Sequence, residues 1–414
     1  MSEVERFPEG FLWGAATSSH QVEGDQPGSD WTEWEREPGR IHDGTRSGDA
    51  CACWRGEAER DLERARALGL RAIRVSLEWS RLEPEHGVWD QTAFTRYAAL
   101  LDHAHAIGLH PFITLNHFTL PRWLSERGSW LSSDAPALFA HYAMRVARLL
   151  GARDAHWATL NEPSVLAFMG YLGTAWPPGK GSPVAAYTAL RHMLLAHARG
   201  RAAFKEVRPE ARVGLVMNCP AFDPARPERR RDRVVAAAQD WAFTGCVLHA
   251  LTQGRLVPPL HPTTQAAPEL RESLDWVGLN YYGRFRVRFD ASAPAELFGR
   301  RLADATIHTE HNDWGEVHPE GLTRNLERLA ALGVPLHVTE NGMYTHDDEA
   351  RARYVEDHVR AVRAAITRGA DVRSYQVWSL VDNFEDQAKI FRIFCVADGG
   401  FLPLAAEQAK RHLR

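Results

Sequence analysis

Eight short apolar segments recur along this chain, and they constrain its fold more than any other feature. Each is rich in β-branched or aromatic residues, which is typical of buried β-strands. The segments are Phe11–Thr17, Arg71–Leu77, His110–Asn116, His156–Asn161, Arg212–Asn218, Leu274–Tyr282, Leu336–Glu340 and Val372–Leu380. We therefore expect eight strands, separated by longer stretches that must return the chain to the next strand.

The stretches between these segments have the spacing of amphipathic helices. Glu57–Leu68 places Leu62, Ala65 and Leu68 on one helical face, and Gly69 follows directly before the second strand. The same arrangement follows Thr92–Ile107, Ala135–Leu150 and Leu322–Leu332, whose next residues are Gly108, Gly151 and Gly333. A helix, a glycine and then a strand is the usual joint of an α/β fold.

Eight strands that alternate with helices favour a closed parallel (β/α)8 barrel. A doubly wound open sheet is the alternative, and it would often carry a glycine-rich phosphate loop after the first strand. Residues 18–24 read SSHQVEG and contain no such loop. We see no linker, so we expect residues 1–414 to form a single domain. The long loops 24–55, 170–185 and 283–315 would follow strand ends and build one face of the barrel.

Charge and cysteine content exclude several classes of protein. The net charge of -4 argues against a nucleic-acid partner. The basic cluster between Arg226 and Arg233 contains Pro227 and Glu228, and we interpret it as a solvated loop that enters a helix. The five cysteines are odd in number and match no zinc spacing, which favours reduced thiols.

We expect neither a secretory signal nor a membrane anchor from the sequence pattern. Residues 1–10 include acidic residues and no apolar run, unlike a secretory signal. No stretch approaches eighteen consecutive apolar residues, so we expect no membrane span. These observations together predict a cytoplasmic protein.

Polar side chains gather where the predicted strands end. They are His20-Gln21, Asn116-His117, Asn161-Glu162, Asn280-Tyr281-Tyr282, Glu340-Asn341 and Trp378. In a closed barrel these ends converge on one pocket. The chain also has 14 tryptophans, whose faces can stack on sugar rings or fill a core.

Two carboxylates, Glu162 and Glu340, would face each other across that pocket. Cleavage of a glycosidic bond uses such a pair, with one protonated acid for the leaving oxygen and one ionised group on the other face. The distance between the two carboxyl groups decides between retention and inversion of configuration. The sequence leaves that distance open.

The motifs at these strand ends resemble glycoside hydrolase family 1, which includes β-glucosidases and β-galactosidases. The matching segments span nearly the whole chain in the family's order. They are residues 7–24 (FPEGFLWGAATSSHQVEG), 78–81 (EWSR), 117–118 (HF), 159–163 (TLNEP), 278–282 (GLNYY), 339–342 (TENG) and 383–385 (NFE). The resemblance implies a TIM barrel, a small-molecule glycoside as substrate, and neither metal nor cofactor.

The resemblance also implies a role for each matching residue. Glu340 resembles the nucleophile, Glu162 the acid/base, Arg74 and Tyr282 the groups that hold the nucleophile, and Asn161 the contact to the sugar 2-hydroxyl. The remaining matches are Gln21, His117 and Glu385 for the other hydroxyls, Trp378 for the sugar's platform, and Asn280 as a supporting group. The charge of Glu340 should keep Glu162 protonated until Glu340 is esterified, after which Glu162 can act as a base.

The chain departs from the family pattern at Asp386. The family usually has a tryptophan there that contacts the sugar, and a carboxylate removes the aromatic face. One interpretation is a glycone other than plain glucose, such as an amino or deoxy sugar. The other is that Asp386 points away, or that another loop residue replaces the lost contact. Glu385 would repel a 6-phosphate, which disfavours a phospho-β-glycosidase.

Three functions remain to be compared. The first is hydrolysis of a β-glycoside, and the second is transglycosylation from the same intermediate, which product analysis with an added alcohol would distinguish. The third is a catalytically silent sugar-binding protein. Because Glu162 and Glu340 are both present, the sequence favours an enzyme. It does not predict the oligomeric state.

Overall fold

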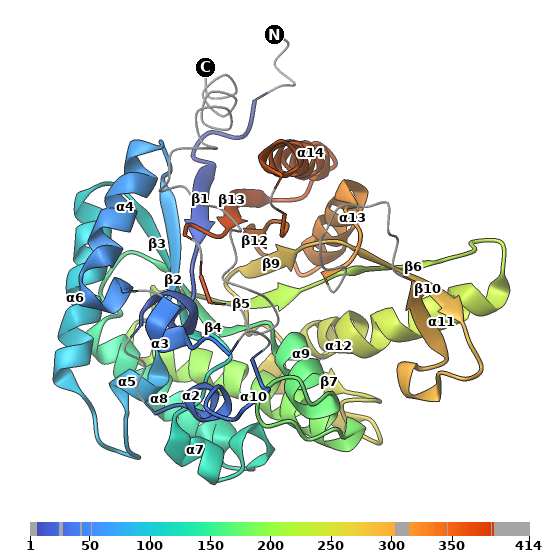
Figure 1. Cartoon of the computed structure of the whole chain (residues 1–414), viewed down its shortest axis with the longest axis horizontal. Helices are drawn as coiled ribbons and strands as arrows, with labels where there is room; N and C mark the ends of the chain where they lie inside the picture. The colour runs from blue at the N-terminus through green and yellow to red at the C-terminus, as the bar shows by residue number, and fades with distance from the viewer. Residues whose placement is uncertain are drawn as a thin grey trace.

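A computed structural model of the chain describes residues 6–24, 28–41, 44–50, 52–302, 314–345, 347–381 and 383–384. The eight predicted strands close into one barrel of parallel strands, so the predicted (β/α)8 fold is confirmed (Figure 1). Around the barrel the strands are β1 (Leu12–Ala16), β13 (Val372–Trp378), β12 (Leu336–Asn341), β9 (Val277–Tyr281), β5 (Arg212–Asn218), β4 (His156–Asn161), β3 (His110–Asn116) and β2 (Ala72–Ser76). The bounds of β3, β4 and β5 match the prediction residue by residue.

The predicted helices are also present, and they pack around the outside of the barrel (Figure 1). Gly69 allows the chain to turn from α4 into β2, because it has a φ of +94°, a conformation that other residues rarely adopt. The α-helices are α1 (Ser19–Val22), α2 (Asp30–Trp34), α3 (Ser47–Ala50), α4 (Glu57–Ala67), α5 (Trp79–Leu82), α6 (Gln91–Ala106), α7 (Arg122–Glu126), α8 (Ala135–Leu149), α9 (Pro163–Leu166), α10 (Pro183–Val207), α11 (Arg230–Asp240), α12 (Cys246–Gln253), α13 (Pro319–Ala330) and α14 (Asp348–Thr367).

One predicted loop is instead an arm with regular structure. Residues 284–302 form β10 (Arg284–Phe289) and β11 (Gly299–Leu302), which join β6 (Ala221–Pro224) in a three-stranded sheet that projects from the barrel (Figure 1). A short pair, β7 (Arg255–Leu256) and β8 (Gln265–Ala266), lies elsewhere. The prediction of a loop at 283–315 was therefore wrong for the arm. The sequence RFRVRF of β10 alternates strictly, and its apolar Val287 packs on Val235 and Ala236 of α11.

The basic cluster begins this arm. Helix α11 starts at Arg230, as the sequence led us to expect. The guanidinium of Arg226 donates to both carboxylate oxygens of the buried Asp232, at 2.7 and 2.9 Å. The charge of Arg226, one of the arginines of the basic cluster, is therefore neutralised by an ion pair within the arm.

One helical run bears on the prediction of no membrane span. Within the described part of the chain, Arg230–Gln253 is long and apolar enough by composition to cross a membrane. Asp240 interrupts the run, and 61% of its most apolar window is buried inside the protein. Core helices share this composition, so the run is weak evidence for a membrane span.

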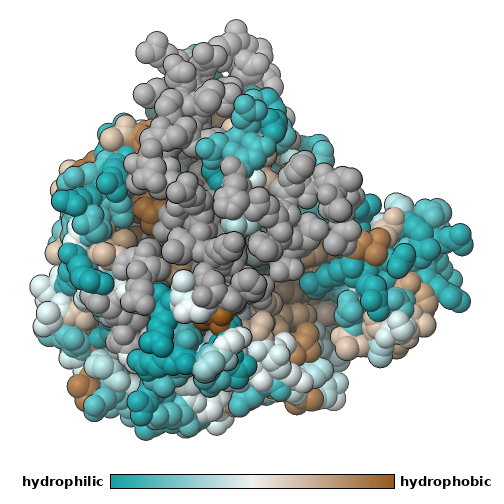
Figure 2. Space-filling view, in the orientation of Figure 1, coloured by the Kyte–Doolittle hydropathy of each residue, from teal (hydrophilic) through white to brown (hydrophobic). Residues whose placement is uncertain are grey.

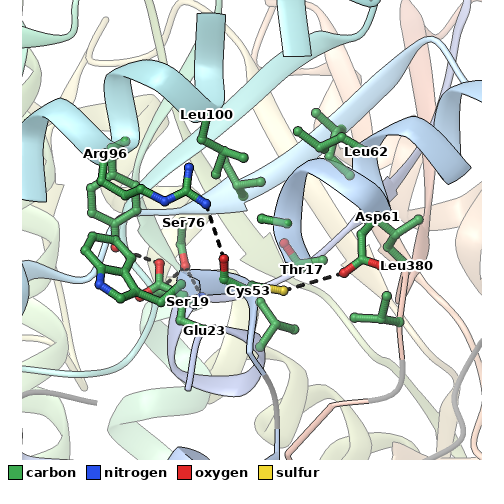
Figure 3. Close-up of a pocket in the computed structure, with 17 residues that line it drawn as sticks. Thr17, Ser19, Glu23, Cys53, Asp61, Leu62, Ser76, Arg96, Leu100 and Leu380 are labelled. Atoms are coloured by element: carbon green, nitrogen blue, oxygen red, sulfur yellow. Dashed lines mark hydrogen bonds between the residues drawn. The ribbon is translucent and has the colours of Figure 1, made fainter. Parts of the chain in front are cut away.

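The core lies between the barrel and its helices, with Trp79, Trp130 and Trp157 fully buried in it. A small cavity of about 50 Å³ remains between β1 and β2 and helices α4 and α6 (Figure 3). In this cavity Cys53 Sγ lies 3.6 Å from a carboxylate oxygen of Asp61. Cys219 and Cys246 are buried thiols that form no disulfide, and Cys51 and Cys395 lie outside the described residues.

Three histidines lie at the end of the barrel where the strands begin. Nε2 of His110 is 2.8 Å from Nδ1 of His156, whose ring centre is 4.7 Å from that of His337. Burial lowers the pKa of His337 to about 3 and that of His110 to about 4, and it also lowers the pKa of His156. The positive charges of Arg373 and Arg212 act in the same direction. All three rings are therefore neutral in the folded protein at neutral pH.

We expect this cluster to make the fold sensitive to acid. Unfolded histidine takes up a proton near pH 6.5, whereas the folded rings do not, so the unfolded state binds more protons as the pH falls. The free energy of unfolding should then fall below about pH 6.5, by about 1.4 kcal/mol per pH unit for each histidine. Urea unfolding between pH 7.5 and 5 measures it. His337→Gln should reduce the slope, whereas His86→Gln at an exposed position should not. An identical slope in the His337→Gln protein would contradict the prediction.

Candidate active site

The strand ends open into one cavity of about 230 Å³. Six of the residues predicted from the sequence line it, and they come from six different parts of the barrel. They are Gln21 on α1, His117 after β3, Glu162 after β4, Tyr282 after β9, Glu340 on β12 and Trp378 on β13. The barrel thus brings together residues that are up to 357 positions apart in the chain, from 21 to 378.

Glu340 is held by two partners at the bottom of this cavity. Its side chain is 4% exposed and forms an ion pair with Arg74, which projects inward from the middle of β2. The hydroxyl of Tyr282 donates a hydrogen bond of 2.5 Å to the other carboxylate oxygen. Both partners favour the ionised form of Glu340 and fix its orientation.

Glu162 has an unusual backbone conformation. It has φ +46° and ψ +61°, the left-handed region, between the end of β4 and the start of α9. The next residue, Pro163, disfavours the right-handed helical conformation at Glu162 but by itself favours extended backbone, so the surrounding structure holds the left-handed turn. The chain thus turns sharply at Glu162, and its buried carboxyl group enters the cavity. A left-handed conformation at a residue with a side chain costs about 1–3 kcal/mol and is concentrated at functional sites.

Two amides bind the same oxygen of Glu162. Asn280 donates to Oε1 at 2.7 Å and Asn218 donates to it at 3.0 Å. Among the described residues, none donates to Oε2 in this structure. That oxygen is therefore free to carry a proton toward a group bound in the cavity.

The two carboxyl groups have different proton affinities. Burial, followed by the charge of Glu340, raises the pKa of Glu162 to about 8. Burial also raises the pKa of Glu340, but Arg74, Tyr282 and Asn280 all act against that rise. Glu162 therefore keeps its proton at a pH where Glu340 has lost its own. This difference is what a paired acid and nucleophile require.

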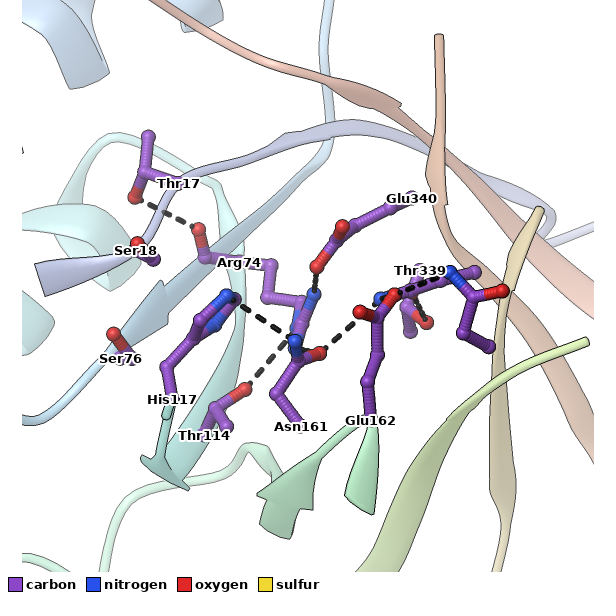
Figure 4. Close-up of polar contacts among 12 residues, drawn as sticks. Thr17, Ser18, Arg74, Ser76, Thr114, His117, Asn161, Glu162, Thr339 and Glu340 are labelled. Carbon is purple, nitrogen blue, oxygen red and sulfur yellow. Dashed lines mark hydrogen bonds and ion pairs between the residues drawn. The ribbon is translucent and has the colours of Figure 1, made fainter. Parts of the chain in front are cut away.

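A network of amides joins the two sides of the site (Figure 4). Oδ1 of Asn161 accepts hydrogen bonds from Arg74 at 2.7 Å and from Asn280 at 3.1 Å. Thr339 donates to Oδ1 of Asn280 at 2.7 Å, which fixes the direction of that amide. The nitrogen of Asn280 consequently faces the carboxylates. The supporting role predicted for Asn280 is consistent with these contacts.

Another wall of the cavity, formed by His117, Trp378 and Gln21, has polar atoms that a ligand could bind. Nε2 of His117 lies 3.2 Å from the amide nitrogen of Asn161, and its buried Nδ1 has no partner among the described residues. Burial and the neighbouring Arg74 lower the pKa of His117, so the ring is neutral. Trp378 lies nearly parallel to it, with ring centres 6.0 Å apart, and the amide of Gln21 binds the backbone oxygen of Phe384 at 3.0 Å.

Two predicted residues, Glu385 and Asp386, lie outside the described residues. The interpretation of Asp386 as a change in the sugar-binding wall therefore stays a prediction.

Several lining residues were not found from the sequence. Asn218 is the last residue of β5, so the rule that strand ends carry the site could have identified it. The aromatic residues of the outer cavity had no such signal, because they come from the arm and from helices. They are Phe168, Phe222, Phe243, Phe285 and Trp314, and Arg301 lies with them.

Comparison with known proteins assigns the family. The sequence model described as Glycosyl hydrolase family 1 matches residues 3–394. The chain is 32% identical over 410 residues to β-glucosidase A of Thermotoga maritima, covering 92% of this chain and 90% of that protein. It is also 29% identical to a β-galactosidase of Pyrococcus woesei, again over 92% of this chain and 90% of the relative.

Solved structures agree with the sequence comparison. A family 1 β-glucosidase from Thermotoga maritima superposes with a TM-score of 0.91 at 29% identity, covering 99% of each chain. The complex of that β-glucosidase with glucoimidazole gives a TM-score of 0.87 at 30% identity, covering 94% of this chain and 93% of the other. Since the family match spans nearly the whole chain and the barrel is the same, this protein belongs to glycosyl hydrolase family 1, as the motifs at its strand ends predicted.

Proposed function

We propose that this protein is a retaining β-glycosidase that works through a covalent glycosyl-enzyme, with Glu340 as nucleophile and Glu162 as acid/base. The observation that carries the proposal is that the two carboxyl groups line one cavity and are linked by a chain of contacts. Asn280 donates to Glu162 and to Asn161. Asn161 also accepts from Arg74, which pairs with Glu340. The charge of Glu340 adds to the effect of burial in raising the pKa of Glu162, as expected for neighbouring carboxyl groups. Retaining enzymes separate their carboxyl groups by about 5–5.5 Å, whereas inverting enzymes leave room for a water molecule.

The proposed reaction has two steps. In the first, a carboxylate oxygen of Glu340 bonds to the anomeric carbon, the bond to the leaving oxygen breaks, and Glu162 gives its proton to that oxygen. In the second, water attacks the anomeric carbon, Glu162 takes the proton of that water, and the ester bond to Glu340 breaks. Each step inverts the anomeric carbon, so the free sugar keeps the β configuration.

The configuration of the first product tests this mechanism directly. Proton NMR during hydrolysis of a nitrophenyl β-glycoside distinguishes the two anomers before they equilibrate. We expect the β anomer to appear first. The α anomer as first product would exclude a covalent intermediate on Glu340.

The identity of the sugar is a separate question within the same proposal. We propose that the glycone differs from plain glucose because of Asp386, which replaces the family's usual tryptophan. Comparing kcat/KM over a panel of nitrophenyl β-glycosides, including amino and deoxy sugars, tests it. A clear preference for the plain glucoside would contradict this part and leave the mechanism unaffected.

We expect the rate to depend on the proton of Glu162. Because burial and Glu340 raise the pKa of Glu162 to about 8, kcat/KM should decrease as the pH rises through that value. The acidic side of the profile should report protonation of Glu340. A profile that stays flat up to pH 10 would contradict the assignment of Glu162 as the acid.

A further inference from the structure

The outer half of the cavity has a wall of aromatic rings. The ring centres of Phe168 and Phe243 are 5.0 Å apart, those of Phe243 and Phe222 are 6.1 Å apart, and those of Phe222 and Phe285 are 5.7 Å apart. This wall runs from the π-helix Ala167–Leu172 to the sheet of the arm. Figure 2 shows apolar side chains in the hollow where the arm leaves the body of the molecule. Flat apolar groups could stack along such a wall.

Arg301 stands at the end of this wall. Its guanidinium carbon lies 4.5 Å from the ring centre of Phe285 and 5.4 Å from that of Phe222. The strand register explains this position, because Phe285 pairs with Phe222 on β6 while Val287, two residues further on the same face, pairs with Arg301 on β11. A guanidinium that stacks on aromatic rings can still donate hydrogen bonds from its edge.

Three other arginines of the arm sheet are paired with carboxylates, and the exposed Arg288 lies on the opposite face of β10. Arg284 and Arg286 bind the buried Glu316, and Arg300 binds Asp290 at 2.7 Å. For Arg301, in contrast, no carboxylate lies within ion-pair distance among the described residues, although the side chain lines the cavity. Among the described residues, Arg301 is thus a positive group on an apolar wall with no carboxylate in ion-pair contact, and the charge of Glu296 acts on it only from a greater distance.

We propose that the outer half of the cavity selects an aromatic aglycone that carries a carboxylate, and that Arg301 binds this carboxylate. The proposal rests on the glycosidase function proposed above and specifies its leaving group. The aromatic part stacks on the phenylalanine wall, and the carboxylate accepts hydrogen bonds from the guanidinium edge. A planar guanidinium donates two parallel bonds to a carboxylate, which gives both affinity and direction.

A matched pair of substrates tests this inference. The pair is the 4-(carboxymethyl)phenyl and the 4-(carbamoylmethyl)phenyl β-glycoside, built on the sugar that the nitrophenyl panel favours. Their phenols differ by a charge that is insulated from the leaving oxygen by a methylene group. For the native enzyme we expect kcat/KM about tenfold higher for the carboxylate, mainly through a lower KM, as for one charge-assisted pair. Arg301→Gln should remove this preference, so that the two substrates then differ by no more than about twofold in kcat/KM.

Two further variants separate charge from geometry. Arg301→Lys keeps the charge without the planar fork and should keep only part of the preference. Arg288→Gln removes an exposed arginine from the opposite face of β10 and should leave the preference unchanged. Equal rates of the native enzyme on both substrates would overturn the inference, and so would a preference that survives Arg301→Gln. If no nitrophenyl glycoside is hydrolysed at all, the proposed function itself fails.

Discussion

Replacing Glu340 by alanine is expected to abolish turnover, with kcat falling by about 10⁴-fold or more, the scale on which loss of a nucleophile acts in hydrolases. The physical reason is that no other described carboxylate contacts both Arg74 and Tyr282. Small anions offer a second measurement. Azide can enter the space left by the side chain and attack the anomeric carbon, so it should restore turnover of an activated substrate and give the α-glycosyl azide. Unchanged activity in the alanine variant would contradict the mechanism.

The alanine variant also leaves Arg74 buried without its counter-charge, and this needs a control. Breaking a buried ion pair costs about 3–5 kcal/mol, so lost activity could reflect lost structure. Glu340→Gln keeps the volume and one hydrogen-bond acceptor, and it should be equally inactive with a smaller loss of stability. Asp275→Asn breaks the pairs with Arg201 and Lys205 at the far end of the barrel. It should lower the unfolding midpoint and leave kcat unchanged.

Replacing Glu162 by glutamine is expected to give the second largest effect, a fall in kcat/KM of about 10²–10⁴-fold, the range attributed to general acid–base catalysis. The fall should be greatest for substrates whose leaving oxygen most needs a proton. It should be small for dinitrophenyl glycosides, whose leaving group departs as an anion.

The glutamine variant should also lose the decrease in rate above about pH 8, because the group that titrates there is gone. Azide should again accelerate the reaction, but now by attacking the glycosyl-enzyme, so the product is the β-glycosyl azide. Opposite azide products from the two variants would assign the two roles without reference to relatives. An alkaline decrease that persists in the glutamine variant would instead contradict the assignment.

Much of the fold could be predicted because the barrel's signals are local. The strands β3, β4 and β5 are continuous apolar runs, and their predicted bounds match the structure. The arm was missed because β10 alternates charged and apolar residues and pairs with β6, more than sixty residues away, a contact that no local pattern reveals. The alternation of arginine and apolar residues in β10 is visible in the sequence, but the sequence does not show with which strand β10 pairs.

The site could be predicted in part for the same reason. Strand ends pointed to Glu162 and Glu340, and they could have pointed to Asn218. Arg74 lies in the middle of β2, so its place beside Glu340 followed only from the family resemblance. Arg301 could be found neither from the strand ends of the barrel nor from the family resemblance, because its position depends on the register of two strands of the arm.

The fixed amide of Asn280 has a consequence for the order of events in the reaction. Thr339 prevents this amide from turning, so its nitrogen divides its bonds between Glu162 and Asn161. Asn161 also accepts from Arg74, the partner of Glu340. When Glu340 becomes an ester it loses its charge and becomes a weaker acceptor for Arg74, which can then bind Asn161 more strongly. The amide of Asn280 is then left to Glu162, at the moment when Glu162 must ionise to activate water. A chain of fixed side chains would thus pass the state of the first carboxyl group to the second, and the enzyme would need no moving part to alternate between its two half-reactions.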